Sequence, residues 1–119
     1  MKLTNQKAFD KIYKYFIFKK NKQAVNDAGN CKFREGESRC AVGVLIPNKK
    51  YNVLMEEQTI DSIREDYFYE EWSVLSLSLL RALQNAHDVS NNWRKGLLTK
   101  TSHKRVAKSY SLTITKEPK

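Results

Sequence analysis

The clearest pattern along the chain is an apolar stripe near its start. Its hydrophobic residues recur at the spacing of one face of an α-helix, and lysines occupy the other faces. Thr4 suits the N-cap, because its side-chain oxygen can accept a hydrogen bond from a backbone N–H of the first turn. We therefore predict a first helix from about residue 5 to about residue 20. The stripe consists of Phe9, Ile12, Tyr13, Phe16 and Ile17.

A second apolar stripe predicts a helix over about 72–89. Its residues again recur at helical spacing, and an extra leucine widens the buried face. The helix should be long enough to cover the first one, so we expect the two stripes to pack against each other with the segment 40–46 between them. The stripe consists of Leu75, Leu79, Leu80, Leu83 and Ala86.

The C-terminal part of the chain carries weaker patterns. A third helical region is expected to begin near Asn91 or Asn92 and to break near residue 100, because Gly96 and the polar stretch after it weaken it. A shorter apolar face follows over 106–110. The alternation over 112–115 permits a final strand, and the last four residues should form a frayed tail.

The segment 31–46 predicts a small β element. Residues 31–34 suit a short strand, and Gly36 suits the turn after it. The apolar run from Cys40 to Ile46 is too short for periodicity to decide between a buried strand and a short buried helix. The expected fold class is therefore α+β, mostly α, with three or four helices packed around a short β-hairpin element at about 31–46. We expect a single domain spanning 1–119.

Residues 49–71 are irregular and acidic, and an aromatic group lies at their C-terminal end. Ile60 and Ile63 suit one short helical turn within them. Because the aromatic residues lie among carboxylates, two interpretations stay open. They pack against the first helix, or they form an acidic lid or partner surface that leaves room for a homodimer contact. The group comprises Tyr67, Phe68, Tyr69 and Trp72.

Composition narrows the class of protein. The chain has 119 residues, 40% of them hydrophobic, which is enough for one core. No apolar run approaches the ~20 residues of a membrane span, and Lys7, Lys11 and Lys14 interrupt the apolar stretch nearest the N-terminus. We therefore expect neither a membrane protein nor a secreted one. Two cysteines and 29% charged residues are typical of a reduced, cytoplasmic protein.

The net charge of +9 is unevenly distributed along the chain. Residues 1–34 carry a formal charge of +7, residues 35–75 carry −5, and residues 76–119 carry +7. A chain with this order can fold so that its two ends form one positive surface. Such a surface concentrates nucleic acid, nucleotides or acidic proteins. The alternative is that the lysines serve solubility alone.

Cys31 and Cys40 carry the thiols of the chain, with eight residues between them. Zinc ligand pairs usually lie two to four residues apart, so this spacing favours buried free thiols over a metal site. The two cysteines together with His87 and His103 would supply the four ligands of a zinc site. If the segments of the two cysteines form a hairpin, a disulfide between them is the other alternative. We predict no metal and no cofactor. A Cys–His nucleophilic pair would need an oxyanion loop and an orienting third residue, and the sequence shows neither.

Gln84, His87 and Asp88 lie at i, i+3 and i+4 of the second predicted helix. This spacing points three polar groups at one patch beside the apolar stripe. Two interpretations stay open. The three residues belong to a ligand site, or they only satisfy the helix end, with the histidine near the exposed carbonyls and the aspartate capping the next segment of the chain.

Arg34 and Arg39 flank the predicted turn of the β element. Each presents a planar guanidinium that suits phosphate or carboxylate, unlike the many lysines of this chain. Either the turn presents a guanidinium into a cleft, or the arginines pair internally with acidic residues. In the second case Asp88 or Glu56 would neutralise an arginine outright.

Several of these residues recur as motifs in a fixed order. They are Cys31-x-Phe33-Arg34, the run Cys40-Ala41-Val42-Gly43-Val44-Leu45-Ile46-Pro47, then Tyr51, Glu56 and Leu83-Gln84-x-x-His87-Asp88. In this order they resemble a family of small uncharacterised proteins of bacteriophages, prophages and bacterial genomes. Within the family pattern Cys31, Cys40 and Gly43 would be structural. Phe33 replaces the more usual Tyr, and Val44 stands where a third Cys is common, which further disfavours a metal site.

The resemblance implies a phage-type accessory protein. Small phage proteins of this size commonly bind a host component such as a defence nuclease, a polymerase factor or a signalling nucleotide. We therefore expect a non-enzymatic protein in the host cytoplasm that inhibits or sequesters a host component, a host protein or an anionic ligand, and so serves host-defence evasion. The alternatives are a basic nucleic-acid-binding accessory protein and a small enzyme with a Cys/His site. The residues expected near the specific site are Arg34, Arg39, Tyr51, Gln84, His87 and Asp88.

Overall fold

The computed structural model describes residues 2–25, 32–89 and 92–114, and these form five α-helices and two short β-hairpins. The fold class is therefore α+β and mostly α, as predicted. None of the described helices is both long and apolar enough to cross a membrane. In chain order the elements are α1 (Asn5–Tyr13), the π-helical η1 (Lys14–Phe18), β1 (Arg34–Glu35), β2 (Ser38–Arg39), α2 (Ala41–Val44), the 3-10 helix η2 (Val53–Glu57), α3 (Ile60–Tyr67), α4 (Leu77–Asp88), β3 (Trp93–Arg94), β4 (Leu97–Leu98) and α5 (Lys100–Ser109).

The first helix begins where the sequence predicts. Thr4 is its N-cap, and the side-chain oxygen of Thr4 accepts a hydrogen bond from the backbone N–H of Lys7 at 3.2 Å. After Tyr13 the helix widens into η1, which ends at Phe18, close to the predicted end. All five residues of the predicted stripe are buried, so the assignment of the buried face is confirmed.

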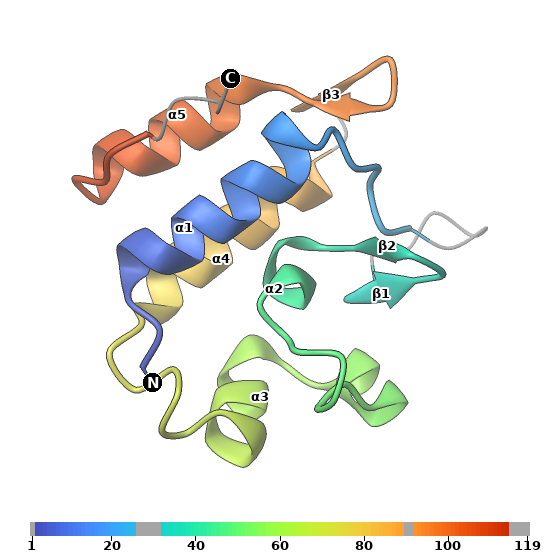
Figure 1. The fold of residues 1–119 in the computed structure, drawn as a ribbon, viewed down its shortest axis with the longest axis vertical. Coiled ribbons are helices and arrows are strands. Elements are labelled where there is room, and N and C mark those ends of the chain that lie inside the picture. Colours follow the sequence, from blue (N-terminus) through green and yellow to red (C-terminus); the bar gives the residue numbers. More distant parts are fainter. Residues whose placement is uncertain (1, 26–31, 90–91, 115–119) are drawn as a thin grey trace.

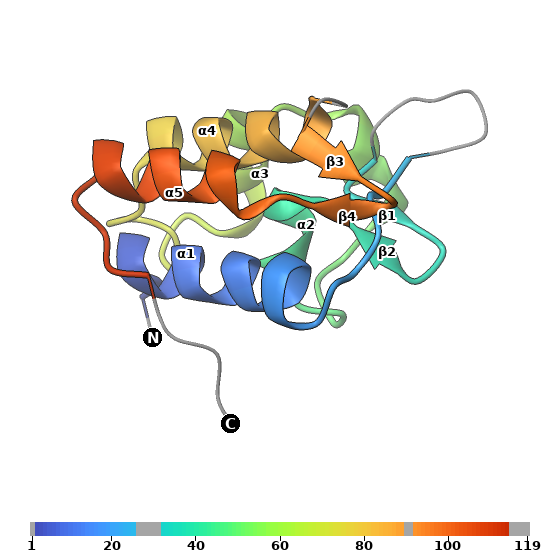
Figure 2. The same ribbon diagram turned by 90° about the horizontal axis from the view of Figure 1, so that it is seen from above.

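The helices α1 and α4 form a pair between α5 and α3 in Figure 1, and Figure 2 shows them on opposite sides of the molecule. In Figure 1, α5, α1 and α3 follow one another from top to bottom, and α4 lies behind α1. Figure 2, seen from above, places α5 next to α1 and α4. Both hairpins lie at the right-hand end of the helices in the two views. The acidic α3 is thus separated from α5 by the central pair of helices.

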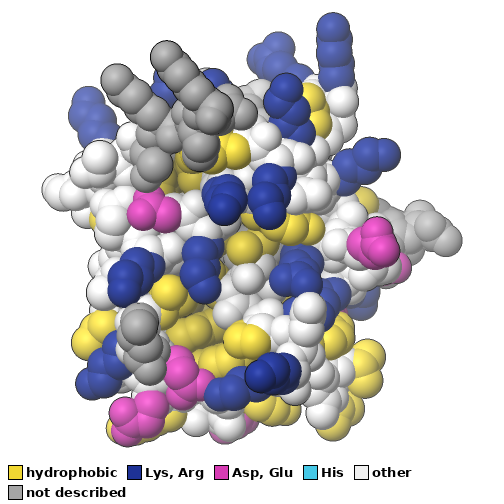
Figure 3. Space-filling view, viewed as in Figure 1, with side chains coloured by type: hydrophobic (Ala, Val, Ile, Leu, Met, Phe, Trp, Pro, Cys, Tyr) yellow, Lys and Arg dark blue, Asp and Glu magenta, His cyan; other side chains and the backbone are white. Residues whose placement is uncertain are grey.

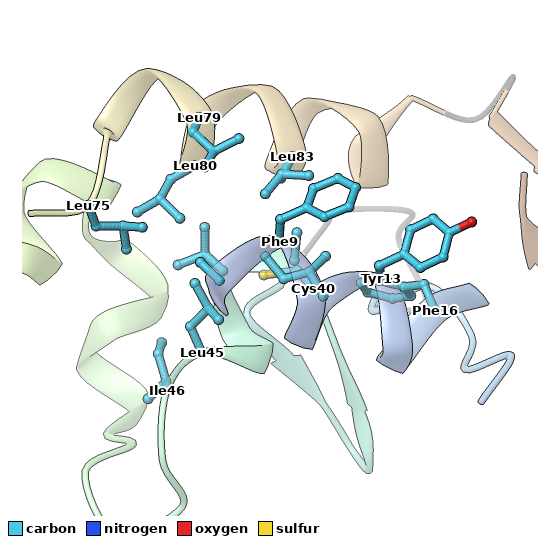
Figure 4. Packing of buried hydrophobic residues seen from close by; sticks show 14 of the residues in the cluster. Phe9, Tyr13, Phe16, Cys40, Leu45, Ile46, Leu75, Leu79, Leu80 and Leu83 are labelled. Atoms are coloured by element: carbon cyan, nitrogen blue, oxygen red, sulfur yellow. The ribbon is translucent and has the colours of Figure 1, made fainter. Parts of the chain in front are cut away.

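The core lies between α1, α2 and α4, as predicted. The short helix α2 contacts both of the longer ones. Figure 4 shows Phe9 of α1 next to Leu83 of α4, with Cys40 at the start of α2 close by. These three residues are completely buried. The two predicted stripes therefore face one core, and α2 fills the space that they leave.

The ambiguous segment after β2 is a short helix rather than a strand. Cys40 is its N-cap, and the Sγ atom of Cys40 accepts a hydrogen bond from the backbone N–H of Gly43 at 3.2 Å. The chain passes so close to α2 that a Cβ atom on Gly43 would lie 2.1 Å from the carbonyl oxygen of Phe33. Only glycine allows this approach between α2 and the segment that leads into β1.

The prediction of a third helix beginning near Asn92 is wrong, because the described residues 93–98 form the hairpin β3–β4. Lys95 and Gly96 at its turn both have positive φ angles, 54° and 78°. Positive φ at both central residues is the geometry that a two-residue hairpin turn requires. The shorter apolar face expected over 106–110 belongs to α5, which begins at Lys100 and buries Val106 and Ala107.

The second predicted helix begins later than expected, at Leu77 instead of near residue 72. Ser76 caps it, and the hydroxyl oxygen of Ser76 accepts a hydrogen bond from the N–H of Leu79 at 3.2 Å. The residues before it form turns, and of the aromatic group Phe68 and Trp72 are buried there, whereas Tyr69 is exposed. The rings of Phe68 and Trp72 stack with centroids 4.4 Å apart, and both side chains are buried. These two rings belong to the core.

Two further expectations concern short segments. The helical turn expected at Ile60 and Ile63 is part of α3, which is capped by Thr59. The final strand expected over 112–115 is not formed by the described residues 112–114. Leu112 follows Ser111, whose φ of 54° turns the chain, and Leu112 is partly buried against the core instead.

Candidate functional site

The residues predicted to bind a ligand come from three segments, the first hairpin, the loop after α2 and the end of α4. Each of them forms hydrogen bonds inside the chain. These bonds join the first hairpin to the loop after α2, and they join α4 to α2. The prediction that the same residues also hold a ligand stays a prediction. The residues are Arg34, Arg39, Tyr51, Gln84, His87 and Asp88.

Glu56 of η2 is the centre of the contacts around the first hairpin. Its Oε1 accepts a hydrogen bond from the N–H of Phe33 at 2.8 Å, and its Oε2 accepts one from the N–H of Arg34 at 3.0 Å. The hydroxyl of Tyr51 also donates to Oε2, at 2.5 Å. Burial, followed by this bond to Glu56, raises the pKa of Tyr51 to about 12. One carboxylate thus joins the chain before the hairpin to the loop after α2.

Arg34 is held internally, and Arg39 points to a loop. The Nη2 of Arg34 donates to the carbonyl oxygen of Ile46 at 2.7 Å, and its guanidinium carbon lies 4.5 Å from the centre of the Tyr51 ring. Burial, and then the charge of Arg39, lower the pKa of Arg34. Arg39 pairs with Arg34 across the hairpin, and its Nη2 donates to Oδ1 of Asn48 at 2.6 Å. The guanidinium of Arg34 is therefore held by a backbone carbonyl and an aromatic ring, whereas its contact with the acidic Glu56 is made through the backbone N–H.

Gln84 links α4 to the start of α2. Its Oε1 accepts a hydrogen bond from the N–H of Val42 at 3.0 Å, which satisfies a backbone donor in the first turn of α2. Its Nε2 donates to Oδ1 of Asp88 at 2.8 Å. The spacing of four residues does bring Gln84 and Asp88 together, as predicted. Both the oxygen and the nitrogen of the Gln84 amide therefore form hydrogen bonds within the chain.

His87 is completely buried, and both of its ring nitrogens are engaged. The Nε2 accepts a hydrogen bond from the backbone N–H of Ala24 at 3.2 Å, and Nδ1 lies 2.8 Å from Oδ1 of Asp88. An acceptor role for Nε2 places the proton on Nδ1, which donates to Asp88. The carbonyl oxygen of His87 accepts from the side chains of Gln23 and Trp93. His87 therefore joins the chain after η1 and the hairpin β3–β4 to α4.

A pocket of about 230 Å³ lies between the segment before the first hairpin, the chain from η2 to the start of α3, and the end of α4. Two carboxylates, Glu56 and Asp88, line it together with Gln58, Gln84 and the single cation Lys32 among the described residues. An anion placed there would face two negative charges and one positive charge. Of the six residues expected near a specific site, only Gln84 and Asp88 line this pocket, and its charge does not favour the anionic ligand expected there.

Cys40 has the environment of a structural thiol. It is buried, it caps α2, and burial is the main reason that its pKa is raised to about 12. A nucleophilic cysteine needs a lowered pKa and access to substrate, and Cys40 has neither. Cys31 lies outside the described residues, so a disulfide or a shared metal stays an untested alternative. Among the described residues no group of three His, Cys, Asp or Glu side chains could hold a metal ion.

His103 is a buried ionisable residue whose environment the sequence analysis did not assign. It is completely buried on α5, and its ring lies 6.0 Å from that of Phe9 and 5.8 Å from that of Tyr13. In the part of the chain that the structure describes, neither ring nitrogen has a hydrogen-bond partner. Burial lowers its pKa to about 4. Its position before Val106 and Ala107 on one helical face is the signal that could have indicated its burial.

The largest feature outside these contacts is a positively charged face on α1, η1 and α5. Figure 3 shows lysine and arginine side chains spread over the α1 side of the molecule, with apolar surface exposed between and below them. Most acidic residues of 56–71 belong to η2 and α3, which lie below α1 in Figure 1, whereas Glu71 follows α3 and lines a hollow together with Lys11. We call this surface the basic face; its exposed residues are Lys7, Lys11, Lys14, Lys19, Lys20, Lys100, Lys104, Arg105 and Lys108.

The fold joins the two basic ends of the sequence into this face. His103 of α5 packs against two aromatic rings of α1. The side chain of Gln6 donates to the carbonyl oxygen of Thr113 at 2.8 Å and accepts from the N–H of Thr113 at 2.9 Å. These contacts hold α5 and the chain after it beside α1. The two basic segments of the sequence therefore lie side by side, with exposed lysines and arginines on neighbouring helices.

Comparisons with protein-family models, with curated proteins and with solved structures found no match for this chain. The resemblance to phage and prophage proteins stays a prediction. The function proposed below accordingly depends on the geometry and charge of the described residues.

Proposed function

We propose that this protein is a non-enzymatic binding protein that holds an anionic partner on the basic face and thereby sequesters or inhibits it. The observation that carries this proposal is that α1, η1 and α5, which carry exposed lysines and an exposed arginine, lie side by side. Like charges gathered on one face attract and orient an anionic partner more strongly than the same charges scattered over the surface.

The state of the candidate catalytic residues supports a binding role. The thiol of Cys40 is buried and has a raised pKa, and both ring nitrogens of His87 are occupied by internal hydrogen bonds. Neither residue is arranged as a nucleophile or as a general base. If the chain is phage-encoded, as the resemblance implies, the partner would be a host component met in the host cytoplasm. That partner would be a defence protein or another anionic factor.

The test is a pull-down from bacterial lysate with the immobilised protein, repeated over a series of salt concentrations. We expect partners that elute as salt rises, because screening weakens contacts between exposed charges. The double variant Lys11→Glu, Lys14→Glu should lose them. Its matched control is Arg64→Glu, Arg81→Glu, which changes the net charge equally at the acidic end, where these arginines pair with Glu65 and Asp61. Equal loss in both variants, or binding that ignores salt, would contradict the proposal.

A further inference from the structure

We infer that a groove along α1 takes an acidic protein segment that also carries apolar side chains. This inference rests on the proposed function and adds the chemistry of the partner. The groove consists of two adjoining hollows that share Lys11. One, of about 190 Å³, also has Lys14, Lys19 and Val44 on its walls. The other, of about 170 Å³, lies between α1, the end of α2 and residues 68–72. We call the two hollows together the α1 groove.

The charge of the α1 groove is positive. Lys11, Lys14 and Lys19 line one side of it. Among its described lining residues the one carboxylate is that of Glu71, which forms an ion pair with Lys50. The hydrogen bond from Lys50 is also the main reason that the pKa of Glu71 is lowered. A carboxylate on a partner therefore meets three lysines here, and the one acidic group is already neutralised.

The π-helical turn contributes to this arrangement. In η1 the backbone N–H of Lys19 donates to the carbonyl oxygen of Lys14 at 2.9 Å, a hydrogen bond that spans five residues. This wider turn brings residues five apart closer to one side of the helix than an ordinary α-helical turn does. Lys14 and Lys19 therefore line the same hollow. Single π-helical turns occur frequently at functional sites.

The apolar part of the α1 groove distinguishes a peptide from a nucleic acid. Its walls include Val44, Leu45 and Pro47. Single-stranded nucleic acids bind by stacking bases on exposed aromatic rings. Here the rings of Phe68 and Trp72 stack on each other and are buried. Tyr15, which also lines the groove, is partly buried, packs edge-to-face with Phe16 and accepts a hydrogen bond from the N–H of Arg39. Aliphatic side chains beside lysines match a peptide that alternates apolar and acidic residues, the complement of an amphipathic helix in a groove.

Fluorescence anisotropy with three labelled probes tests this inference. The probes are an amphipathic peptide of about 18 glutamates and leucines, an oligoglutamate of equal charge, and an oligothymidine of about 20 nucleotides. We expect the amphipathic peptide to bind at least about tenfold more tightly than the other two, which corresponds to about 1.4 kcal/mol. Val44→Asp should weaken it by about tenfold or more. The same change at the highly exposed Val53 of η2 is the matched control and should have no effect.

The other outcomes separate this inference from the proposed function. Equal binding of all probes, or tightest binding of the oligothymidine, would overturn the peptide groove while leaving a basic binding face. Binding of no probe would also overturn it, and the lysate experiment would then decide the proposed function by itself. Circular dichroism checks the fold of each variant. If Val44→Asp does not fold, the milder Val44→Ser takes its place, and unchanged peptide affinity in that variant would contradict the inference.

Discussion

Among the single residues, His103 has the least ordinary environment. It lies between aromatic rings with no hydrogen-bond partner for either ring nitrogen among the described residues. A charged imidazole there would lose its hydration without gaining a partner. In the folded chain the imidazole of His103 therefore has a pKa of about 4, whereas in the unfolded chain it binds a proton near the ordinary pKa of 6.5. Because the unfolded state binds more protons between these values, the free energy of unfolding falls as the pH falls.

We predict that the free energy of unfolding falls by about 1 kcal/mol between about pH 7 and about pH 5.5 because of His103, and by about 3 kcal/mol in total once the pH is below 4. Urea unfolding at several pH values measures this dependence. His103→Leu removes the titrating group at similar volume, so it should flatten the dependence above about pH 5.5. It should leave the stability at pH 7 unchanged or raised, because it also removes two unsatisfied nitrogens. An unchanged pH profile in His103→Leu would show that another group titrates.

Gly43 lies at a position where the structure leaves no space for a side chain. A Cβ atom at Gly43 would overlap the carbonyl oxygen of Phe33, which belongs to rigid backbone. We predict that Gly43→Ala lowers the free energy of unfolding by about 3 kcal/mol or more. The matched control is Gly36→Ala at the hairpin turn, where φ is +61° and no atom lies within 4 Å of the new Cβ. It should cost only about 1–2 kcal/mol. A milder effect at Gly43 than at Gly36 in urea unfolding would contradict this assignment.

At the scale of the elements, one carboxylate holds the first hairpin to the loop after α2. Truncation of Glu56 to alanine leaves two backbone N–H groups and the hydroxyl of Tyr51 without their acceptor. We predict a loss of about 2–4 kcal/mol in the free energy of unfolding. The neighbouring Glu57 is exposed, so Glu57→Ala should stay within about 0.5 kcal/mol. Equal losses would mean that the Glu56 contacts contribute little to stability.

The packing of α1 against α4 can be tested with one buried and one exposed side chain. Leu79 is completely buried, and Lys14 is exposed. We predict that Leu79→Ala costs about 2–5 kcal/mol, through lost burial and the cavity left behind. Lys14→Ala should stay within about 0.5 kcal/mol. Denaturant unfolding of both variants checks the assignment of helix faces, and similar losses would contradict it.

The elements differ in how far the sequence could predict them. The stripe of α1 is long and regular, so its buried face follows from spacing alone. The hairpin β3–β4 was missed because Trp93 and Leu97 also fit a helical face, and a turn with Lys95 at positive φ is rare for a residue other than glycine. The segment of α2 is too short for periodicity, and its helix depends on the cap from Cys40 and on the approach of Phe33, which are tertiary features.

The candidate site could be predicted only in part. Spacing on a helix brings Gln84 and Asp88 together, and the sequence indicates that much. It does not indicate that Glu56 accepts from two backbone N–H groups, because backbone donors are invisible in a pattern of side chains. The contact of the Arg34 guanidinium with the carbonyl oxygen of Ile46 is invisible in the sequence for the same reason, because that acceptor also belongs to the backbone. For this reason the charge of the whole molecule is a better guide to function than the motif residues.

At the scale of the whole molecule, positive charge outweighs negative charge on the basic face, where Asp10 of α1 is the one carboxylate within the described residues of α1, η1 and α5. The ion pairs Lys50–Glu71, Arg64–Glu65 and Arg81–Asp61 all use acidic residues of the segment 61–71. The basic face, in contrast, joins two segments that each carry a formal charge of +7. Repulsion between α1 and α5 must therefore oppose the contacts that His103 and Gln6 make between them.

We predict that sodium chloride stabilises this protein by screening that repulsion. Between about 20 mM and about 300 mM salt, the Debye length falls from about 20 Å to about 6 Å, so charges on neighbouring helices stop interacting. The free energy of unfolding, measured by urea titration, should rise by about 0.5–1 kcal/mol. Lys11→Glu with Lys14→Glu places acidic groups within the basic face, so this variant should show a smaller rise. Arg64→Glu with Arg81→Glu has the same net charge but leaves the basic face intact, so its rise should not shrink in the same way. If salt instead lowered the stability of the unmodified protein, attractive ion pairs would outweigh repulsion. The basic face would then not destabilise the free protein, and an anionic partner would have no repulsion to neutralise.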